Sequence, residues 1–285
     1  MTNTSTRTDF TSTPRRTGRP THLPPEWATP GPVAVITASV FLGPWLIWGS
    51  RIAEGQGALS WHLPTGIALW SIWPLLTLSL LATGGRAALA DLWSRLLRWR
   101  VPTRWYLVAL LTPPIAATAT VGIASVTGVP LRLGANLSIT GALVYLCYGV
   151  GLFLLTEEAA WRGALLPRLQ SRLSPMTASL LLGVVWTTWH VPSLHVPGET
   201  DQGLSLPVFA VLVTATTILI TALVNAAGGS VIIAAVFHAS FDAAYAYTGV
   251  VGGNPRLLLI ATALTVAAAA CVSIRTRGCL CAPSH

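Results

Sequence analysis

The sequence predicts an all-α polytopic membrane protein that crosses the bilayer about eight times. Only 9% of the 285 residues are charged, whereas soluble globular domains carry about 25%. Apolar residues make up 53% of the chain, and the mean hydropathy is +0.64. The apolar residues also gather in uncharged stretches that are long enough to cross a hydrocarbon core. These three observations exclude an ordinary soluble domain.

The apolar stretches give the expected helices in chain order. Each stretch has about the 20 residues that a helix needs to cross a bilayer. The fourth helix is expected to continue to about Leu169, because no strong stop signal comes before Ser171 and Pro175. The eight windows are 33–50, 66–84, 105–126, 137–157, 175–192, 206–227, 230–250 and 256–274.

These helices are expected to form one membrane domain, residues 32–274, between two cytoplasmic tails. Residues 1–31 are rich in Thr, Pro and Arg and have few aliphatic side chains, so the sequence predicts a disordered tail there. Residues 275–285 form the second tail, whose Cys279 and Cys281 are expected to be reduced. The residues that carry chemistry lie in a core at 137–250.

The arginines predict the orientation in the membrane. All 17 basic residues are arginine, and with eight spans one side receives all of them except Arg51, Arg132 and Arg256. Cytoplasmic segments carry the excess of basic residues, so we expect an integral multi-pass protein of the cell membrane with both termini cytoplasmic. The formal net charge of +8 therefore reflects topology. The bilayer is the expected partner, and nucleic acid is not, because the charge is not gathered on a solvated domain.

The segment between the second and third windows is predicted to be an interfacial helix. Leu89, Leu92, Trp93, Leu96 and Leu97 fall on one face at helical spacing. Such an amphipathic helix typically lies in the plane of the headgroups.

Ionisable residues within the predicted spans are the candidates for function. Each costs about 2.5 to 3.5 kcal/mol on insertion scales, so those that remain are expected to have a role and to contact one another or water. Six such residues lie in the second half of the chain. They are Glu157, Glu158, Arg162, His190, His238 and Asp242.

Spacing predicts how these residues meet. Glu158 and Arg162 are four apart on one helix, as are His238 and Asp242, so each pair shares a face. Glu157 projects about 100° from Glu158, so it can face a cavity while its neighbour is paired. Glu157 and His190 lie about 16 residues before and after a predicted helical turn, so we expect them at equal depth.

The same residues carry a family resemblance. Glu157-Glu158-Ala159-Ala160-Trp161-Arg162 matches a Glu-Glu-x-x-x-Arg motif. Trp186 to His190 resembles an aromatic-x-x-x-His motif, and His238 to Asp242 resembles His-x-x-x-Asn/Asp. In this order the motifs resemble those of the CAAX protease and bacteriocin-processing (CPBP, or Abi) family of intramembrane proteases, which includes the type II CAAX prenyl endopeptidases. The motif region covers about residues 140–245.

The resemblance implies peptide-bond hydrolysis inside the membrane. Glu157 and His190 would activate a water, and His238 and Asp242 would stabilise the oxyanion. Glu158, Arg162 and Trp186 are assigned supporting roles. The chain departs from the family pattern in having Trp186 where Phe is usual and Asp242 where the eukaryotic enzymes have Asn. An aspartate can donate a hydrogen bond only when it is protonated, so this second departure affects the oxyanion hole.

Two mechanisms remain open. The favoured one uses no cofactor, because the sequence contains no helix signature with two histidines one turn apart. In the alternative, Glu157, His190, His238 and Asp242 are ligands of a catalytic Zn²⁺ with an open water position.

Two other functional classes are weighed against the protease. A transporter is disfavoured, because the chain has no paired broken helices in corresponding halves. A non-catalytic membrane scaffold or bacteriocin-immunity protein is a second alternative, against which all three motifs argue. The expected partner is a peptide or protein substrate at the membrane, either a membrane-associated protein or a leader peptide. The sequence does not indicate whether that substrate is prenylated.

Overall fold

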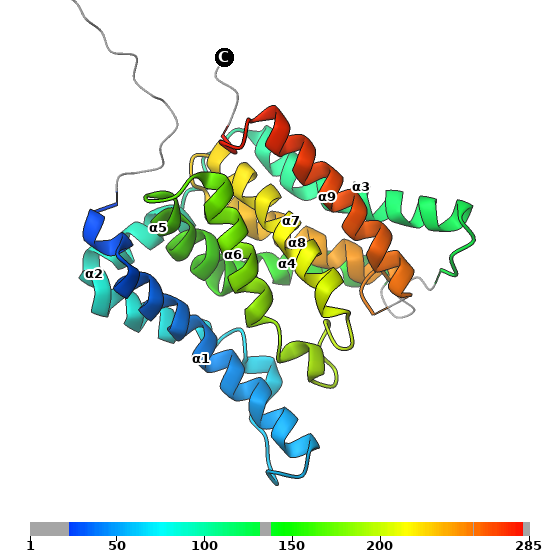
Figure 1. Cartoon of the computed structure of the whole chain (residues 1–285), viewed down its shortest axis with the longest axis horizontal. Coiled ribbons are helices and arrows are strands. Elements are labelled where there is room, and N and C mark those ends of the chain that lie inside the picture. Colours follow the sequence, from blue (N-terminus) through cyan, green and yellow to red (C-terminus); the bar gives the residue numbers. More distant parts are fainter. Residues whose placement is uncertain (1–22, 132–137, 253, 282–285) are drawn as a thin grey trace, which may run out of the picture.

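The computed structural model describes residues 23–131, 138–252 and 254–281, and in this part of the chain every regular element is helical (Figure 1). Two short 3-10 helices come early in the chain, η1 (Pro25–Ala28) and η2 (Thr65–Ile67), and a third, η4 (Ser193–His195), follows α6. A π-helical segment, η3 (Ala159–Leu165), lies between α4 and α5. The α-helices are α1 (Pro30–Gly55), α2 (Ile72–Leu96), α3 (Thr103–Val126), α4 (Ile139–Leu155), α5 (Leu166–Gln170), α6 (Pro175–Trp189), α7 (Leu206–Ala226), α8 (Val231–Thr248) and α9 (Pro255–Arg275).

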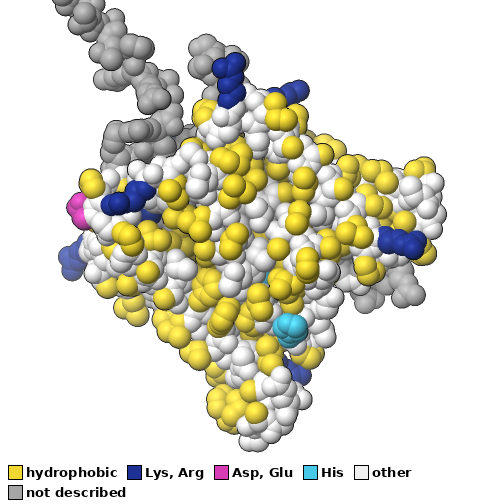
Figure 2. All heavy atoms as spheres, viewed as in Figure 1, with side chains coloured by type: hydrophobic (Ala, Val, Ile, Leu, Met, Phe, Trp, Pro, Cys, Tyr) yellow, Lys and Arg dark blue, Asp and Glu magenta, His cyan; other side chains and the backbone are white. Residues whose placement is uncertain are grey.

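Each of the eight predicted windows coincides with a helix, and the protein is a multi-pass membrane protein. Within the described residues, seven helical stretches are long and apolar enough to cross a membrane. The fifth window gives α6, which at 15 residues is shorter than a typical span. Apolar side chains cover much of the visible surface, and charged side chains are sparse there (Figure 2).

The two predicted tails differ from the structure where they can be compared. Most of the first tail, residues 1–22, lies outside the described residues. Its last part is ordered, because η1 forms there and α1 begins at Pro30, two residues before the expected boundary. At the other end, Cys279 and Cys281 form a disulfide, so the expectation of reduced cysteines is wrong.

The segment predicted to be a separate interfacial helix is the continuation of α2. Gly85 leaves helical geometry at φ 63° and ψ −160°, but the helix resumes and α2 continues to Leu96. Leu92 and Leu96 are 1% and 2% exposed in the main hydrophobic core. The reason is close packing, since a Cβ on Gly163 would lie 2.5 Å from the Leu92 Cδ1 atom. Leu92 and Leu96 of this face therefore pack on protein, whereas Trp93 and Leu97 are 38% and 66% exposed.

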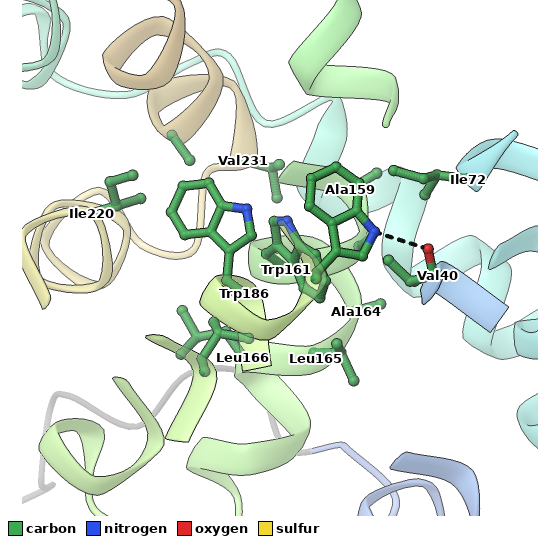
Figure 3. Close-up of a cluster of buried hydrophobic side chains, with 14 of the residues drawn as sticks. Val40, Ile72, Ala159, Trp161, Ala164, Leu165, Leu166, Trp186, Ile220 and Val231 are labelled. Carbon is green, nitrogen blue, oxygen red and sulfur yellow. Dashed lines mark hydrogen bonds between the residues drawn. The ribbon is translucent and has the colours of Figure 1, made fainter. Parts of the chain in front are cut away.

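Helix α8 lies at the centre of the second half of the bundle. It packs against α3 and α4, while α6 packs on α7 and α7 on α9 (Figure 1). The main core includes Trp161 and Trp186, whose ring centroids are 6.5 Å apart (Figure 3). The segment η3, α6 and α8 all contribute to this core, so the three predicted motifs come together inside the protein.

Candidate active site

The two adjacent glutamates lie where the helical path changes. Helix α4 ends at Leu155, and the backbone of Thr156 leaves helical geometry at φ −116° and ψ −93°. The π-helical segment η3 begins directly after Glu158 and leads into α5. The predicted continuation of the fourth helix to about Leu169 is thus present, but it is not regular. Single π-turns within helices occur frequently at functional sites.

Glu158 is completely buried and has two basic partners. Its Oε1 atom lies 2.8 Å from Arg162 Nη1, as the spacing of four predicts, and 2.8 Å from His238 Nδ1. The guanidinium carbon of Arg162 also lies 4.4 Å from the centroid of the Trp186 ring. Glu158 therefore joins η3 to α8 through buried charged groups.

Glu157 has partners of a different kind. It is 3% exposed, and its Oε2 atom accepts hydrogen bonds from Trp186 Nε1 at 2.8 Å and Trp161 Nε1 at 3.3 Å. Both donors are neutral indoles. In the described part of the chain, no side-chain hydrogen bond reaches Glu157 Oε1 and no ion pair reaches the carboxylate. This carboxylate keeps an oxygen for a further partner.

His190 directly follows the last residue of α6 and contacts the residue one turn before it. Its Nδ1 atom lies 2.8 Å from the carbonyl oxygen of Trp186. A carbonyl can only accept, so Nδ1 carries the proton and Nε2 of the neutral ring is left with a lone pair. Nε2 lies 3.9 Å from Asp201 Oδ2, a separation that one bridging water can span.

His238 is held from three sides. Glu158 binds its Nδ1 atom, Phe153 stacks on its ring at 3.9 Å with 6° between the planes, and Trp186 meets it edge-on at 5.3 Å. Nε2 lies 3.9 Å from Asp242 Oδ2, which agrees with the predicted pairing of these two residues.

Trp186 is the residue around which the predicted site assembles. Its indole binds Glu157, its carbonyl binds His190 and its ring contacts His238. Among the described residues, no hydrogen bond joins Glu157 directly to either histidine. Glu157, His190 and His238 therefore gather around one tryptophan without direct hydrogen bonds among the three.

Sequence reasoning missed several members of this site. Asp201, in the loop after α6, faces His190 and accepts a hydrogen bond from Ser193 Oγ at 3.1 Å. Phe153, which stacks on His238, was also missed. Phe153 lies four residues before Glu157, one helical turn away, so spacing could have identified it. No periodic signal marks Asp201.

The metal-ligand set proposed from sequence does not appear in the geometry. Across the residues that the structure describes, no group of three or more His, Cys, Asp or Glu side chains is placed to hold a metal ion. Glu157 Oε2 faces two indoles and His238 Nδ1 faces Glu158, which leaves Glu157 Oε1 and His238 Nε2 as the atoms of these two residues that could bind a metal.

The fold defines a multi-pass membrane protein, and its helices bury a cluster of carboxylates and histidines. Residues 134–244 match the family model for type II CAAX prenyl endopeptidase Rce1-like proteins. The resemblance seen in the motifs is therefore confirmed, and it covers η3, α6 and most of α8.

A curated relative points to the same family. A segment of 40 residues is 48% identical to CAAX prenyl protease 2 of Methanococcus maripaludis. The segment covers 14% of this chain and 15% of the relative. The chain therefore matches only a small part of that protein's length. The family model and the relative are both named for CAAX prenyl proteases.

Proposed function

We propose that this protein is an intramembrane endopeptidase in which Glu157 is the general base. The single observation that carries the proposal is the difference in partners between two neighbouring carboxylates. Glu158 is neutralised by Arg162 and His238, whereas Glu157 accepts hydrogen bonds from indoles alone. A carboxylate without a cationic partner keeps the ability to accept a proton from a water bound at Oε1.

His190 orients the same water. Its Nε2 lone pair accepts one hydrogen of the water, while the Nδ1 proton stays on the carbonyl of Trp186. Because Trp186 also donates to Glu157, one residue fixes both groups that handle the water. Asp201 Oδ2 lies 3.9 Å from His190 Nε2 and stabilises the ring when it carries positive charge.

His238 stabilises the oxyanion. Glu158 holds its Nδ1 proton, and Nε2 of the imidazolium points a second proton toward the side of Asp242. Asp242 orients this edge of the ring when ionised and adds a second donor when protonated.

The chemical step balances without an added cofactor. Glu157 takes one proton from the water, and the resulting hydroxide bonds to the peptide carbonyl carbon. The carbonyl oxygen becomes an oxyanion next to His238. When the C–N bond breaks, the proton held by Glu157 passes to the leaving amine. The products are a carboxylic acid and an amine, and the acid then gives its proton to the amine, which leaves a carboxylate and an ammonium group.

The substrate is proposed to be a peptide segment at the membrane, in a membrane-associated protein or a leader peptide. The relative from Methanococcus maripaludis is named a CAAX prenyl protease, and this name makes a prenylated C-terminal peptide the first substrate to test. A non-catalytic scaffold is the second candidate function. It would be favoured if the wild-type protein cleaved neither peptide in the assay below.

The test is a proteolysis assay in liposomes with the full chain. Two peptides are compared, one farnesylated at a C-terminal Cys-aliphatic-aliphatic-X box and one leader peptide without a lipid, each with and without a chelator. The proposal expects that at least one of the two peptides is cleaved. The chelator should not lower the rate of that cleavage. Loss of cleavage with chelator and recovery with Zn²⁺ would instead support a zinc protease.

A further inference from the structure

The disulfide after α9 lies outside the site described above. It joins Cys279 to Cys281 with a single residue, Leu280, between them. Cys279 is exposed and Cys281 is half-buried, whereas the Leu280 side chain is completely buried. The turn follows Arg275, the last residue of α9, at the end of the described chain (Figure 1). The bond is therefore at the surface of the protein, and it flanks a buried side chain.

The short separation of the two cysteines limits what the bond contributes to folding. A disulfide stabilises a protein mainly by constraining the unfolded chain, and this effect grows with the length of the loop that the bond closes. The Cys279–Cys281 bond encloses one residue, so it removes little freedom from the unfolded chain. It also joins no two helices. The bond therefore fits a local role better than a role in holding the bundle together.

The backbone of Leu280 is held in an unfavourable conformation inside this small ring. Its φ is 45°, in the left-handed region that is costly for a residue with a side chain. Arg277 also has a positive φ, of 49°, but it caps α9. The N–H groups of Arg277 and Gly278 donate to carbonyl oxygens of the last helical turn, at 3.1 and 2.8 Å. Leu280 has no such cap, because its N–H meets only the Thr276 hydroxyl, at 3.3 Å. The flanking disulfide is what restrains this residue.

The predicted topology adds a chemical argument. The distribution of the arginines predicts that this end of the chain is cytoplasmic. Disulfides are rare in the cytoplasm, and those that form there are usually transient and act in catalysis or redox sensing. Exposed or strained disulfides are also the ones that exchange most readily with thiols. Exposure, loop length, backbone conformation and predicted location therefore all favour exchange.

We propose that Cys279–Cys281 is a redox-active disulfide whose substrate is a dithiol, and that its reduction releases the buried Leu280. One thiolate of the dithiol attacks the Cys279 sulfur, and Cys281 leaves as a thiolate. The second thiolate of the dithiol then attacks the partner sulfur of the mixed disulfide, and Cys279 leaves in the same way. The dithiol is oxidised to a disulfide, and its two electrons and two protons end on the two cysteines.

The position of Cys281 is the reason for a dithiol as the substrate. A single thiol bound to Cys279 would be expelled by Cys281, which is two residues away and has a high effective concentration. A partner that carries a second thiol completes the reaction before this reversal. The exchange does not depend on the proposed protease activity.

The first test measures exchange on the full chain in detergent. Cys147 and Cys271 are free and exposed, so both are replaced by serine, and alkylation followed by intact mass then counts only the thiols of Cys279 and Cys281. The air-oxidised protein is treated with dithiothreitol, reduced thioredoxin or glutathione at equal thiol concentration. A parallel sample is unfolded in guanidinium before dithiothreitol is added.

Both dithiols are expected to give two labels per chain. The rate with dithiothreitol should be within about threefold of the rate for the unfolded chain, and the rate with glutathione should be about tenfold lower. A faster reaction with thioredoxin than with dithiothreitol would identify a protein dithiol as the substrate, and the reverse would identify a small one. The proposal is overturned if the air-oxidised protein already carries two thiols, or if the native bond resists a dithiol that reduces the unfolded chain. Equal rates with glutathione and dithiothreitol would overturn the assignment of a dithiol.

The second test measures the release of Leu280. Trypsin cleavage after Arg277 is followed in detergent before and after reduction, and reduction should accelerate it about tenfold, because the opened turn enters the protease more readily. Cys279→Ser cannot close the ring and should be cleaved at the fast rate under both conditions. The matched control Cys271→Ser removes a free cysteine of α9, keeps the disulfide and should respond to reduction as wild type does. Equal cleavage of oxidised and reduced wild type would overturn the release of Leu280.

Discussion

Glu157 and Glu158 are neighbours in the chain and equally inaccessible, yet their surroundings differ in kind. Glu158 meets a guanidinium and an imidazole, each at 2.8 Å, whereas Glu157 meets two indole N–H groups. Because adjacent helical residues project about 100° apart, one step along the chain directs the first carboxylate to α6 and the second to α8. In the proposed mechanism, Glu158 has a structural role and Glu157 a chemical one.

The contrast also shows how a buried charge is tolerated. An ion pair removed from water is sensitive to the loss of either partner, because the remaining charge is left uncompensated. A carboxylate held by neutral donors can gain or lose a proton without breaking such a pair. We therefore expect changes at Glu158 to affect stability most and changes around Glu157 to affect turnover most.

The largest effect on stability is expected from Glu158→Gln. The substitution leaves Arg162 buried without a counter-charge, and loss of one partner of a buried pair typically costs about 3–5 kcal/mol. Thermal unfolding in detergent measures the change. The double variant Glu158→Gln with Arg162→Met should recover part of the loss, and no recovery would mean that the ion pair is not what Glu158 stabilises.

Trp186→Phe should lower kcat by about 10-fold and leave KM unchanged, because it removes the indole hydrogen bond that holds Glu157 but keeps an aromatic ring. Steady-state kinetics on the cleaved peptide checks this. The matched control is Trp189→Phe on the same helix, whose indole binds the carbonyl of Val40 and not Glu157. Equal effects of the two substitutions would refute a specific role for Trp186.

Asp201→Asn should lower kcat roughly fivefold, which corresponds to about 1 kcal/mol of support for the charged His190 ring. The carboxylate is 3.9 Å from His190 Nε2, so its effect is weaker than that of a direct hydrogen bond. The control is Glu199→Gln in the same loop. An unchanged kcat for Asp201→Asn would remove Asp201 from the mechanism.

The smallest effect on stability is expected from a substitution at Glu199. This residue lies outside the predicted spans, and its carboxylate accepts a hydrogen bond from an indole, Trp48 Nε1, at 3.1 Å. The pKa of Glu199 is raised, mainly because the carboxylate is partly buried. The hydrogen bond from Trp48 lowers this pKa, and the negative charge of nearby Asp201 raises it. The folded state then binds the proton more tightly than the unfolded state, so the stability of the protein falls as the pH rises above about 4.3.

Glu199→Gln should therefore stabilise the protein near neutral pH by less than about 1 kcal/mol. The gain should disappear in acid, where Glu199 is protonated in both states. Unfolding curves at several pH values test this. A gain that persists at low pH would contradict the assignment to burial of the charge.

Local spacing could predict one part of this site. The pairing of Glu158 with Arg162 and the proximity of His238 to Asp242 follow from a separation of four on a helix. The contact of Glu158 with His238 joins residues 80 apart and depends on how α8 packs, which no local pattern encodes. The role of Trp186 as a donor to Glu157 depends on packing in the same way.

The fold was predictable for a simpler reason, because long apolar stretches have few stable arrangements in a bilayer other than helices. The prediction failed where a local signal was outweighed by packing. The second predicted window ended at residue 84, but α2 continues to Leu96, and Leu92 and Leu96 pack into the core. Asp201 lies in a loop, where hydrophobic periodicity carries no information.

The central claim is that Glu157, and not Glu158, handles the catalytic proton. The most direct measurement is the single-turnover cleavage rate of Glu157→Gln in liposomes, on protein whose unfolding temperature matches that of wild type. The amide keeps an oxygen that accepts from Trp186 but cannot take a proton. We predict that the rate falls by about 1,000-fold. A rate within threefold of wild type would contradict the assignment of Glu157 as the base.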